Sequence, residues 1–581
     1  MDVTPYLDLN IAPRAVFDHL EDRRTRPRFM VPATTDQGDS DWQAVTWGAF
    51  AHQIRRLGQF LLDLGVKPGD RVVLFAHNSV EWISAALATE AVGAVMVPIY
   101  PSSTADQAAY ILDHSDARVA FVDGPGPLKA LLTRWDACAD LLRVVTLSDD
   151  ARPAALLKEL NAVDTPQKLP GYGEVEGRFT SVARALELGR SLDDEHPEAF
   201  DRAMNAVSLD QPAVMLYTSG TTGLPKGVPL THRNIAVNGR DWLQCNAPLI
   251  EDRAVDVLWL PLSHIFGFGE ACLGNTLGFT TYMADPVTVL PLLPEVRPSV
   301  FMSVPRYFEK LSEAAIAQAD RGSREEQVEA LKRLTGGRLK FALSGGAGLT
   351  RDVKDLFYDA GLLIIEGYGL TEASPTLTLN RPDSFRFDTV GKPLPSVEIK
   401  LAEDGEILAR GESIFSGYHK NPKATAETFT DDGWLKTGDL GRFTDDGFLQ
   451  ILGRKKEILV TAAGKNIAPV PIEERFVDDP YISQLLLYGD GKRYLVAAVW
   501  INEETLREKL GEDASSRAIR GLLQPRIDAV NAGLASYETI KDFAVIDEPL
   551  TVENGFLTPT LKVKRRKVYD AFGHRLEELY R

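Results

Sequence analysis

The sequence predicts an α/β fold with mostly parallel sheets, arranged as two α/β halves of one large N-terminal domain. Short apolar runs that fit buried strands alternate with helical stretches between residues 71 and 122. The same alternation returns between residues 255 and 365. This pattern is typical of parallel sheets covered by helices. Shorter strand patterns with turn residues at 396–410 add a small β-rich subdomain.

Each expected element rests on a local pattern. The longest apolar stretch, 82–99, is interrupted by Glu90, so it predicts a buried helix over 81–92 followed by a strand rather than a membrane span. Residues 149–210 are richer in charge and lack clear strand patterns, which indicates an insertion or a lid-like helical segment. Short apolar runs predict the strands, at 71–76, 94–99, 118–122, 213–217, 255–260, 300–304, 339–343 and 362–365.

Composition narrows the class of protein. The 581 residues carry a formal net charge of −18, which argues against nucleic acid as the main partner because phosphate backbones require a basic face. The three cysteines, Cys138, Cys245 and Cys272, form no metal or disulfide pattern and fit a reducing compartment, so we expect a cytoplasmic protein. The first residues have neither a basic segment nor an apolar core, and we expect no secretory signal.

A glycine- and hydroxyl-rich loop follows the expected strand at 213–217. Residues 217–227 read YTSGTTGLPKG. The glycines let backbone N–H groups approach an anion, and Lys226 adds a mobile positive charge. The spacing is not that of the common GxxxxGK[ST] loop, and a flexible linker is the alternative interpretation. We predict that the loop binds the phosphates of ATP through Thr218, Ser219, Gly220, Thr221, Thr222 and Lys226.

Two later loops also follow expected strands. Residues 344–348 read SGGAG, and their glycines allow a flat ligand to lie against bare backbone. Residues 366–372 read EGYGLTE, which combines an aromatic ring, a hydroxyl and a carboxylate able to hold Mg²⁺. A plain strand–loop–helix junction is the alternative for the second loop.

Two motifs near the end of the predicted large domain complete the set. Residues 434–441 read WLKTGDLG, in which Asp439 is suited to accept both hydroxyls of a ribose. Residues 453–458 read GRKKEI and are followed by TAAGKN at 461–466. Their positive charges suit a polyanionic ligand.

Together these motifs resemble one superfamily, the adenylate-forming enzymes that include acyl-CoA synthetases, luciferases and peptide-synthetase adenylation domains. YTSGTTGLPKG, GYGLTE, KTGDLG and GRKKEI occur in the family's order, and the resemblance extends from about Trp47 to the C-terminus. The sequences of residues 461–469 and 557–565 look most like those of long-chain fatty-acid–CoA ligases.

The resemblance implies a two-step reaction and a division of the chain. A carboxylate would attack ATP to give acyl-AMP and pyrophosphate, and CoA would then displace AMP, with Mg²⁺ as the metal. An N-terminal domain at 1–453 would be followed by a small mobile α+β domain at 454–581, with Lys456 as the hinge. Lys562 would be the catalytic lysine. Leu561 precedes it where many relatives have glycine, so Lys564 is a second candidate, and a solvated basic turn is the alternative.

The remaining roles are carried over by the same resemblance. Thr371 would touch the α-phosphate, Glu372 would hold Mg²⁺, and His264 would lie at the wall of the acyl pocket, although a hydrogen-bonded core histidine is the alternative. The other expected ligand contacts are adenine by Gly345, Gly346 and Tyr368, ribose by Asp439 and Arg454, and CoA by Gly464 and Lys465.

Two alternative functions stay open at this level. A fatty acyl-AMP ligase or acyl-carrier-protein synthetase would pass the acyl group to a protein thiol, and a non-catalytic nucleotide-binding protein would have lost Lys562, Glu372 or Asp439, all of which are present. Acyl chain length, oligomeric state and a peripheral membrane contact are left open by the sequence.

Overall fold

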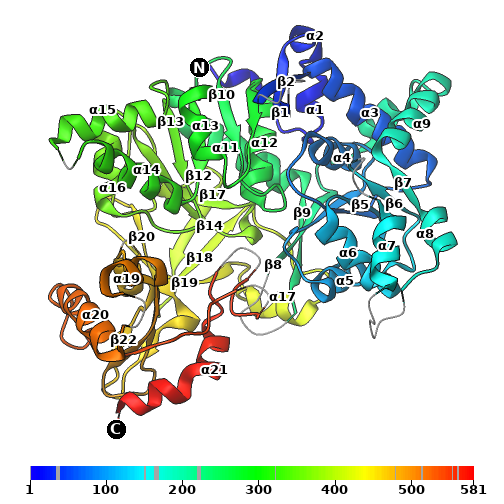
Figure 1. Cartoon of the computed structure of the whole chain (residues 1–581). Coiled ribbons are helices and arrows are strands. Elements are labelled where there is room, and N and C mark those ends of the chain that lie inside the picture. The colour runs from blue at the N-terminus through cyan, green and yellow to red at the C-terminus, as the bar shows by residue number, and fades with distance from the viewer. Residues whose placement is uncertain are drawn as a thin grey trace.

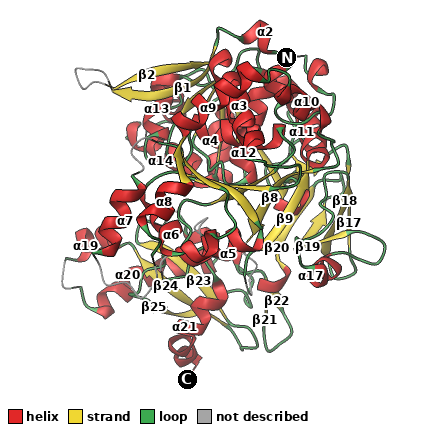
Figure 2. Ribbon diagram, turned by 90° about the vertical axis from the view of Figure 1, so that its right-hand side faces the viewer, coloured by secondary structure: helices red, strands yellow, loops and turns green. Residues whose placement is uncertain are grey.

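The computed structural model describes residues 2–34, 40–148, 152–162, 169–218, 224–320, 322–477, 479–511, 514–551, 554–558 and 562–580. Two large sheets with helices on their faces make up most of the chain, and a smaller lobe formed by the last part of the chain lies beneath them in Figure 1. Figure 2 shows the same arrangement turned by 90°. The predicted mostly parallel α/β architecture is confirmed.

The first large sheet has seven strands in the order β7-β6-β5-β3-β4-β8-β9 and is parallel except at β9. Its strands are β3 (Arg71–Phe75), β4 (Val95–Ile99), β5 (Ala117–Val122), β6 (Arg143–Thr146), β7 (Phe179–Ser181), β8 (Pro212–Thr218) and β9 (Lys226–Thr231). The expected strands at 71–76, 94–99, 118–122 and 213–217 are therefore present within one or two residues.

The second large sheet has nine strands in the order β16-β15-β14-β13-β12-β10-β11-β1-β2, with a parallel centre and antiparallel edges. Its strands are β1 (Pro27–Thr34), β2 (Ser40–Thr46), β10 (Val255–Leu258), β11 (Thr280–Met283), β12 (Val300–Ser303), β13 (Phe341–Ser344), β14 (Ile364–Gly369), β15 (Thr376–Leu379) and β16 (Lys392–Pro393).

One hydrophobic core joins the two large sheets. Helix α4 (Val80–Ala91) is buried on almost every side, because it packs among side chains from both sheets together with α3 (Trp47–Asp63) and α12 (Ile265–Leu277). This explains why its apolar residues show no single helical face. Other helices cover the outer faces, namely α5 (Ala105–His114), α6 (Pro125–Thr133), α11 (His232–Asn246), α13 (Val289–Val296), α14 (Pro305–Gln318), α15 (Arg324–Leu334) and α16 (Arg351–Asp359).

The described parts of 149–210 are helical, as expected, but they do not form a lid. They contain α7 (Pro153–Asn161), α8 (Tyr172–Arg178), α9 (Val182–Glu195) and α10 (Ala199–Ala206). Helix α9 packs along α3 so closely that a Cβ at Gly189 would collide with the backbone of Arg56, and β7 extends the seven-stranded sheet. The sequence missed β7 because three residues are too few to show an alternating pattern.

The β-rich subdomain is a four-stranded antiparallel sheet in the order β17-β18-β19-β20, with α17 (Pro422–Thr428) beside it. Its strands are β17 (Val397–Leu401), β18 (Glu406–Gly411), β19 (Leu435–Phe443) and β20 (Leu449–Arg454). The sheet leads directly into the last lobe through the short helix η5 (Lys455–Glu457).

The C-terminal lobe is built on β23 (Ile482–Tyr488), β24 (Leu495–Ile501) and β25 (Ile540–Val545). Alternate residues of β24 face two different cores: Ala497 and Val499 pack with α20 (Ser516–Asn531), whereas Val496 and Ala498 pack with α21 (Arg565–Glu577). The lobe also contains α18 (Val470–Glu473), α19 (Glu503–Leu510) and the hairpin of β21 (Leu459–Val460) and β22 (Asn466–Ile467). None of the described helices combines the length and apolar character needed to cross a membrane.

Candidate active site

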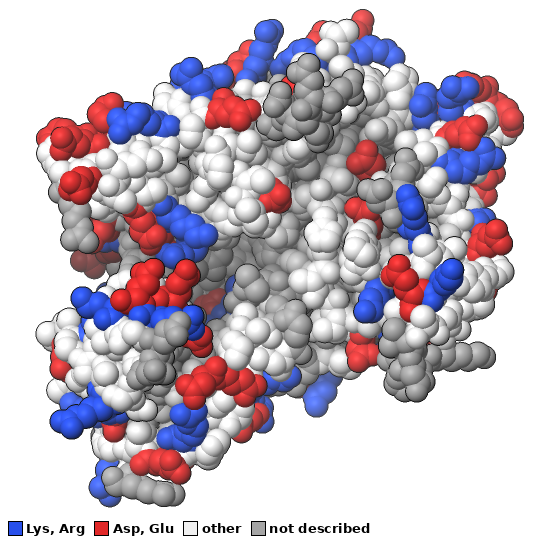
Figure 3. Space-filling view, viewed as in Figure 1, with Lys and Arg blue, Asp and Glu red and all other residues white. Residues whose placement is uncertain are grey.

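Several predicted motifs lie at strand ends that meet near one region. Strands β13 and β14 are parallel neighbours, so the SGGAG loop and Tyr368 leave the same edge of the nine-stranded sheet. Strands β19 and β20 are antiparallel, and their register pairs Asp439 with Arg454. Figure 3 shows the surface hollowed where the C-terminal lobe meets the larger part of the molecule. The fold therefore gathers residues that are far apart in sequence.

Asp439 lies at the centre of a buried polar cluster. Its Oδ2 accepts a hydrogen bond from the hydroxyl of Tyr368 at 2.5 Å, and its Oδ1 lies 2.9 Å from Nε of Arg454. Burial raises the pKa of Asp439, and the charge of Arg454 opposes that rise. Burial and the neighbouring carboxylate also raise the pKa of Tyr368 well above its usual range, so its phenol stays a donor. The three predicted nucleotide-binding residues are thus in contact.

The glycine loop after β13 is held in place from two sides. Gly345 donates its N–H to the carbonyl of Ser303 at 3.2 Å, and a Cβ at Gly345 would lie 3.0 Å from the ring of Phe266. Gly346 has φ +90°, and a Cβ there would meet no atom within 4 Å. The loop therefore presents bare backbone to open space, as a flat ring requires.

A buried ion pair supports that loop and was not found from the sequence. Nζ of Lys354 lies 2.7 Å from Oε2 of Glu366, and Oε1 of Glu366 accepts the N–H of Leu349 at 3.0 Å. Lys354 also donates to the carbonyl of Phe387 at 2.5 Å. Because a lysine on an amphipathic helix usually faces solvent, the pattern of α16 gave no sign of this pair.

Lys562 reaches the Asp439 cluster from the C-terminal lobe. Burial and the charge of Arg454 lower the pKa of Lys562, whereas Asp439 and Glu457 oppose that change. The backbone of Lys562 is tied to Thr558, which accepts its N–H through Oγ1 at 3.0 Å and donates to its carbonyl at 2.8 Å. The charge that acts on Lys564, in contrast, comes from Lys567. Of the two candidate lysines, Lys562 is the one within electrostatic range of Asp439.

His264 is the N-cap of α12 and also faces this region. Its Nδ1 accepts the N–H of Phe266 at 3.1 Å, so the proton of the neutral ring lies on Nε2. Burial, followed by the charge of Lys562, lowers the pKa of His264 to about 4. The ring nevertheless keeps accessible surface, as does Lys562. A side chain that is both surrounded by protein and accessible lines a cleft, so Nε2 is available as a neutral donor.

Lys226 and Glu372 are joined through a residue that the sequence motifs did not include. The hydroxyl of Tyr418 donates to Oε1 of Glu372 at 2.9 Å, and Nζ of Lys226 lies 4.5 Å from the centre of the Tyr418 ring. Thr371 begins the short helix η4 (Thr371–Ala373) that carries Glu372. Ser219, Gly220, Thr221 and Thr222 lie outside the described residues.

The donor set around Glu372 fits Mg²⁺ bound together with a nucleotide. Within the described ranges, no three His, Cys, Asp or Glu side chains are grouped closely enough to hold a metal ion. Mg²⁺ in nucleotide sites commonly takes one or two carboxylates plus phosphate oxygens and water. Glu372 is half-buried and carries a carboxylate beside the strand-end loops, which satisfies that requirement.

The predicted hinge and CoA residues follow β20 in the chain. Lys456 is exposed within η5. Gly464 has φ +71° in a turn closed by its N–H bond to the carbonyl of Thr461 at 2.8 Å. Nζ of Lys465 lies 5.8 Å from the ring centre of Tyr537 in the same lobe. The structure thus brings Asp439, Tyr368, Arg454 and Lys562 together, whereas Gly464 and Lys465 contact Thr461 and Tyr537 of their own lobe.

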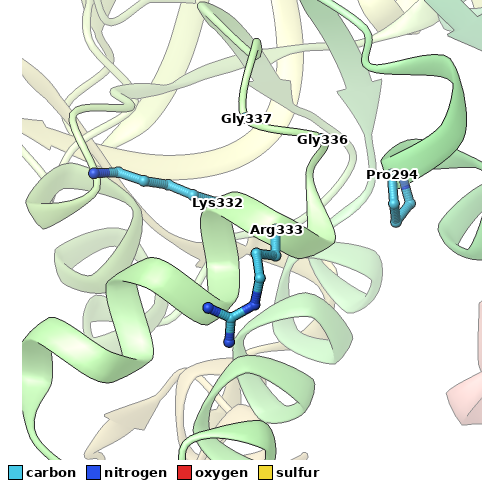
Figure 4. Close-up of a pocket in the computed structure, with 5 residues that line it drawn as sticks. All are labelled: Pro294, Lys332, Arg333, Gly336 and Gly337. Atoms are coloured by element: carbon cyan, nitrogen blue, oxygen red, sulfur yellow. The ribbon is translucent and has the colours of Figure 1, made fainter.

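A shallow surface pocket lies beside α13 and α15. Its lining is shown in Figure 4 and consists of Pro294, Lys332, Arg333, Gly336 and Gly337. Lys332 is paired with Glu329 at 3.2 Å, and Gly336 accepts a bond from Arg297. None of the predicted site residues lines this pocket.

The fold and the site define an adenylate-forming enzyme. Residues 21–419 match the model of the AMP-binding enzyme family, and residues 456–581 match that of the AMP-binding enzyme C-terminal domain. The chain belongs to the AMP-binding enzyme family.

Relatives with similar sequences carry long-chain ligase names. The chain is 34% identical to the long-chain-fatty-acid–CoA ligase FadD15 of Mycobacterium bovis, over 93% of each chain. It is 28% identical to the long-chain-fatty-acid–CoA ligase ACSBG1 of Rattus norvegicus, over 93% of this chain and 82% of the relative. It is also 28% identical to the peroxisomal long chain acyl-CoA synthetase 7 of Arabidopsis thaliana, over 94% and 82%.

Solved structures share the fold at lower identity. The adenylation domain of a carboxylate reductase from Mycobacterium chelonae has a TM-score of 0.82 at 24% identity, covering 100% of this chain and 92% of that one. The anthranilate CoA ligase AuaEII, in complex with anthranoyl-AMP, has a TM-score of 0.76 at 20% identity, covering 99% and 100%. At these identities the likeness concerns the fold.

Proposed function

We propose that this chain is a long-chain fatty-acid–CoA ligase that uses ATP, Mg²⁺ and CoA. In the first step a carboxylate oxygen of the fatty acid bonds to the α-phosphorus of ATP, the bond to the β-phosphate oxygen breaks, and pyrophosphate leaves. In the second step the thiolate of CoA attacks the carbonyl carbon of acyl-AMP, and AMP leaves. The long-chain ligase names of the relatives over most of the chain support the substrate class.

One observation carries the proposal: Lys562, from the C-terminal lobe, lies within electrostatic range of Asp439 and His264 of the large domain and of Arg454 at the domain boundary. A carboxylate approaching a triphosphate is repelled, so the first step needs fixed positive charge where negative charge develops. We assign this role to Lys562. Mg²⁺ held by Glu372 and the phosphate oxygens would offset further negative charge.

The other residues act by binding and orienting. Asp439 accepts hydroxyl donors beside Tyr368, and the open face of Gly346 gives room for the adenine ring. Nε2 of His264 points a neutral N–H into the cleft, where it can orient the carboxyl group of the acid without adding charge. In this assignment Thr371 contacts the α-phosphate, and Thr218 and Lys226 contact the outer phosphates together with the four loop residues that lie outside the described ranges.

For the second step we propose a rotation of the C-terminal lobe about Lys456. We place the domain boundary between residues 453 and 454, at the last residue of β20, just before η5 begins. The rotation would withdraw Lys562 and bring Gly464 and Lys465 to CoA; in this structure Lys465 lies over the ring of Tyr537 in its own lobe. A domain hinge needs only a few residues to absorb such a change.

The test measures AMP release from ATP and Mg²⁺ with carboxylic acids from acetate to long-chain fatty acids, each with and without CoA. CoA-dependent release that peaks with long acids is expected. Adenylate formation that is indifferent to CoA would instead support transfer to a carrier-protein thiol, and no release with any acid would support a nucleotide-binding protein without activity.

A further inference from the structure

The segment 415–419, between β18 and α17, ties together the start of β9, which carries Lys226, and the short helix η4, which carries Glu372. Phe415 donates its N–H to the carbonyl of Glu372 at 2.9 Å. His419 donates its N–H to the carbonyl of Gly227 at 2.9 Å. Between these two backbone bonds, the side chain of Tyr418 contacts both Glu372 and Lys226. Four contacts therefore fix the distance between the start of β9 in the first large sheet and η4, which follows β14 of the second.

Local sequence holds the Tyr418 ring in this position. Gly417 has φ +148°, and a Cβ there would lie 2.5 Å from Cγ2 of Thr425 in α17. Only glycine therefore fits at this position beside the helix. Tyr418 donates its N–H to Oγ1 of Thr425 at 2.9 Å. The ring also meets Phe415 edge-on, with centroids 4.9 Å apart. The ring is thus placed by backbone and packing before any ligand binds.

The arrangement has an electrostatic consequence. Lys226 and Glu372 carry opposite charges and both contact one side chain, yet no ion pair joins them among the residues that the structure describes. A direct pair would neutralise both groups and leave neither free for a ligand. Tyr418 instead donates a hydrogen bond from its hydroxyl to the carboxylate and presents the face of its ring to the ammonium. Because the tyrosine is neutral, both groups keep their charges available for a ligand. Burial and the charge of Glu372 raise the pKa of Tyr418, which keeps the phenol protonated.

We propose that Tyr418 is a positioning residue that holds Glu372 toward the metal and Lys226 toward the outer phosphates, and prevents the two from pairing. This inference rests on the proposed function, in which Glu372 and Lys226 bind Mg²⁺ and ATP. It adds a residue that lies 46 positions after Glu372 and outside the nucleotide-binding motifs.

The experiment measures binding by calorimetry, with Mg·ATP and with ATP in EDTA as the two ligands. Tyr418→Phe keeps the ring and removes the hydroxyl, so Mg·ATP should bind roughly tenfold more weakly, as expected for losing one hydrogen bond to a charged group. Binding of ATP in EDTA should be unchanged in Tyr418→Phe and weakened in Tyr418→Leu, which also loses the ring. In a Glu372→Gln background, Tyr418→Phe should have less effect, because the contact that it removes no longer involves a charged carboxylate.

A matched control removes a similar bond elsewhere. Tyr488→Phe deletes a phenol–carboxylate hydrogen bond to Glu577, 2.6 Å long, in the C-terminal lobe, and should leave both affinities unchanged. Mg·ATP affinity of Tyr418→Phe equal to that of the unaltered protein would overturn the inference, as would an equal loss with both ligands. If Tyr418→Leu does not fold, Tyr418→Phe decides alone. Absence of Mg·ATP binding by the unaltered protein would overturn the proposed function itself.

Discussion

The buried pair of Lys354 and Glu366 makes the strongest quantitative prediction. The two side chains are 7% and 8% exposed, so Lys354→Met leaves a carboxylate in the interior that keeps the hydrogen bond from the N–H of Leu349 but loses its positive partner. Breaking a buried pair by removing one partner costs about 3–5 kcal/mol. Because roughly 1.4 kcal/mol is a factor of ten, local opening around the loop should become about 10² to 10⁴ times more frequent.

Native-state hydrogen exchange at the Leu349 amide and along α16 measures that opening directly, without assuming two-state unfolding of a large chain. The control is Lys332→Met, which breaks an exposed pair with Glu329 and should change exchange by less than about fivefold, the scale of a surface pair. Equal exchange in the two variants would refute the reasoning. Adding Glu366→Gln to Lys354→Met should restore part of the protection, because a neutral amide still accepts the Leu349 bond.

The same pair predicts the direction of a pH effect. Burial raises the pKa of Glu366, and Lys354 opposes that rise. A carboxyl with a raised pKa in the folded state stabilises the fold at low pH, and that contribution is lost as pH rises through the raised value. Removing Lys354 raises the pKa further. The melting temperature of Lys354→Met should therefore approach that of the unaltered protein at acidic pH and fall below it at alkaline pH.

Three further predictions concern the reacting groups. Lys562→Ala should abolish most pyrophosphate exchange while preformed acyl-AMP still reacts with CoA, whereas Lys564→Ala should spare exchange; equal loss of both half-reactions in Lys562→Ala would contradict the assigned role. Glu372→Gln should raise the Mg²⁺ concentration needed for half-maximal exchange, and an unchanged requirement would exclude this ligand. His264 has a pKa of about 4, below its unfolded value, so its neutral form stabilises the fold above about pH 6.5 and that stabilisation is lost toward pH 4. His264→Asn should flatten that decline in thermal unfolding scans, and an unchanged slope would mean that the ring is not held neutral by the fold.

Much of the fold was accessible from the sequence because its strands are buried on both faces. Continuous apolar runs such as β3 and β8 can be recognised without an alternating pattern, and glycines mark the loop after β8. The short strand β7 and the packing of α9 against α3 were not accessible, since both depend on tertiary contacts that leave no periodic mark.

The site divides in the same way. Asp439 and Tyr368 were predicted because each stands in a local motif, and the structure brings them into contact. Tyr418 and Lys354 were missed because their roles come from contacts across 46 and 12 positions, not from their neighbours in the chain. A lysine on a helix or a tyrosine after glycine can have many structural roles, and only the contacts in the folded structure show which role it has.

The geometry around η5 constrains how the proposed rotation can occur. Nζ of Lys455 lies 2.8 Å from Oε2 of Glu406 and 2.5 Å from Oδ2 of Asp404, both at the β17–β18 turn of the large domain. Oε1 of Glu406 also accepts the N–H of Gly438, next to Asp439. The chain is therefore anchored to the Asp439 cluster through residue 455. Lys456 has no such anchor among the described contacts and its side chain is exposed, so backbone rotation at 456 breaks none of these bonds. A pivot placed there lets the C-terminal lobe move Lys562 while Asp439 and its neighbours keep their positions.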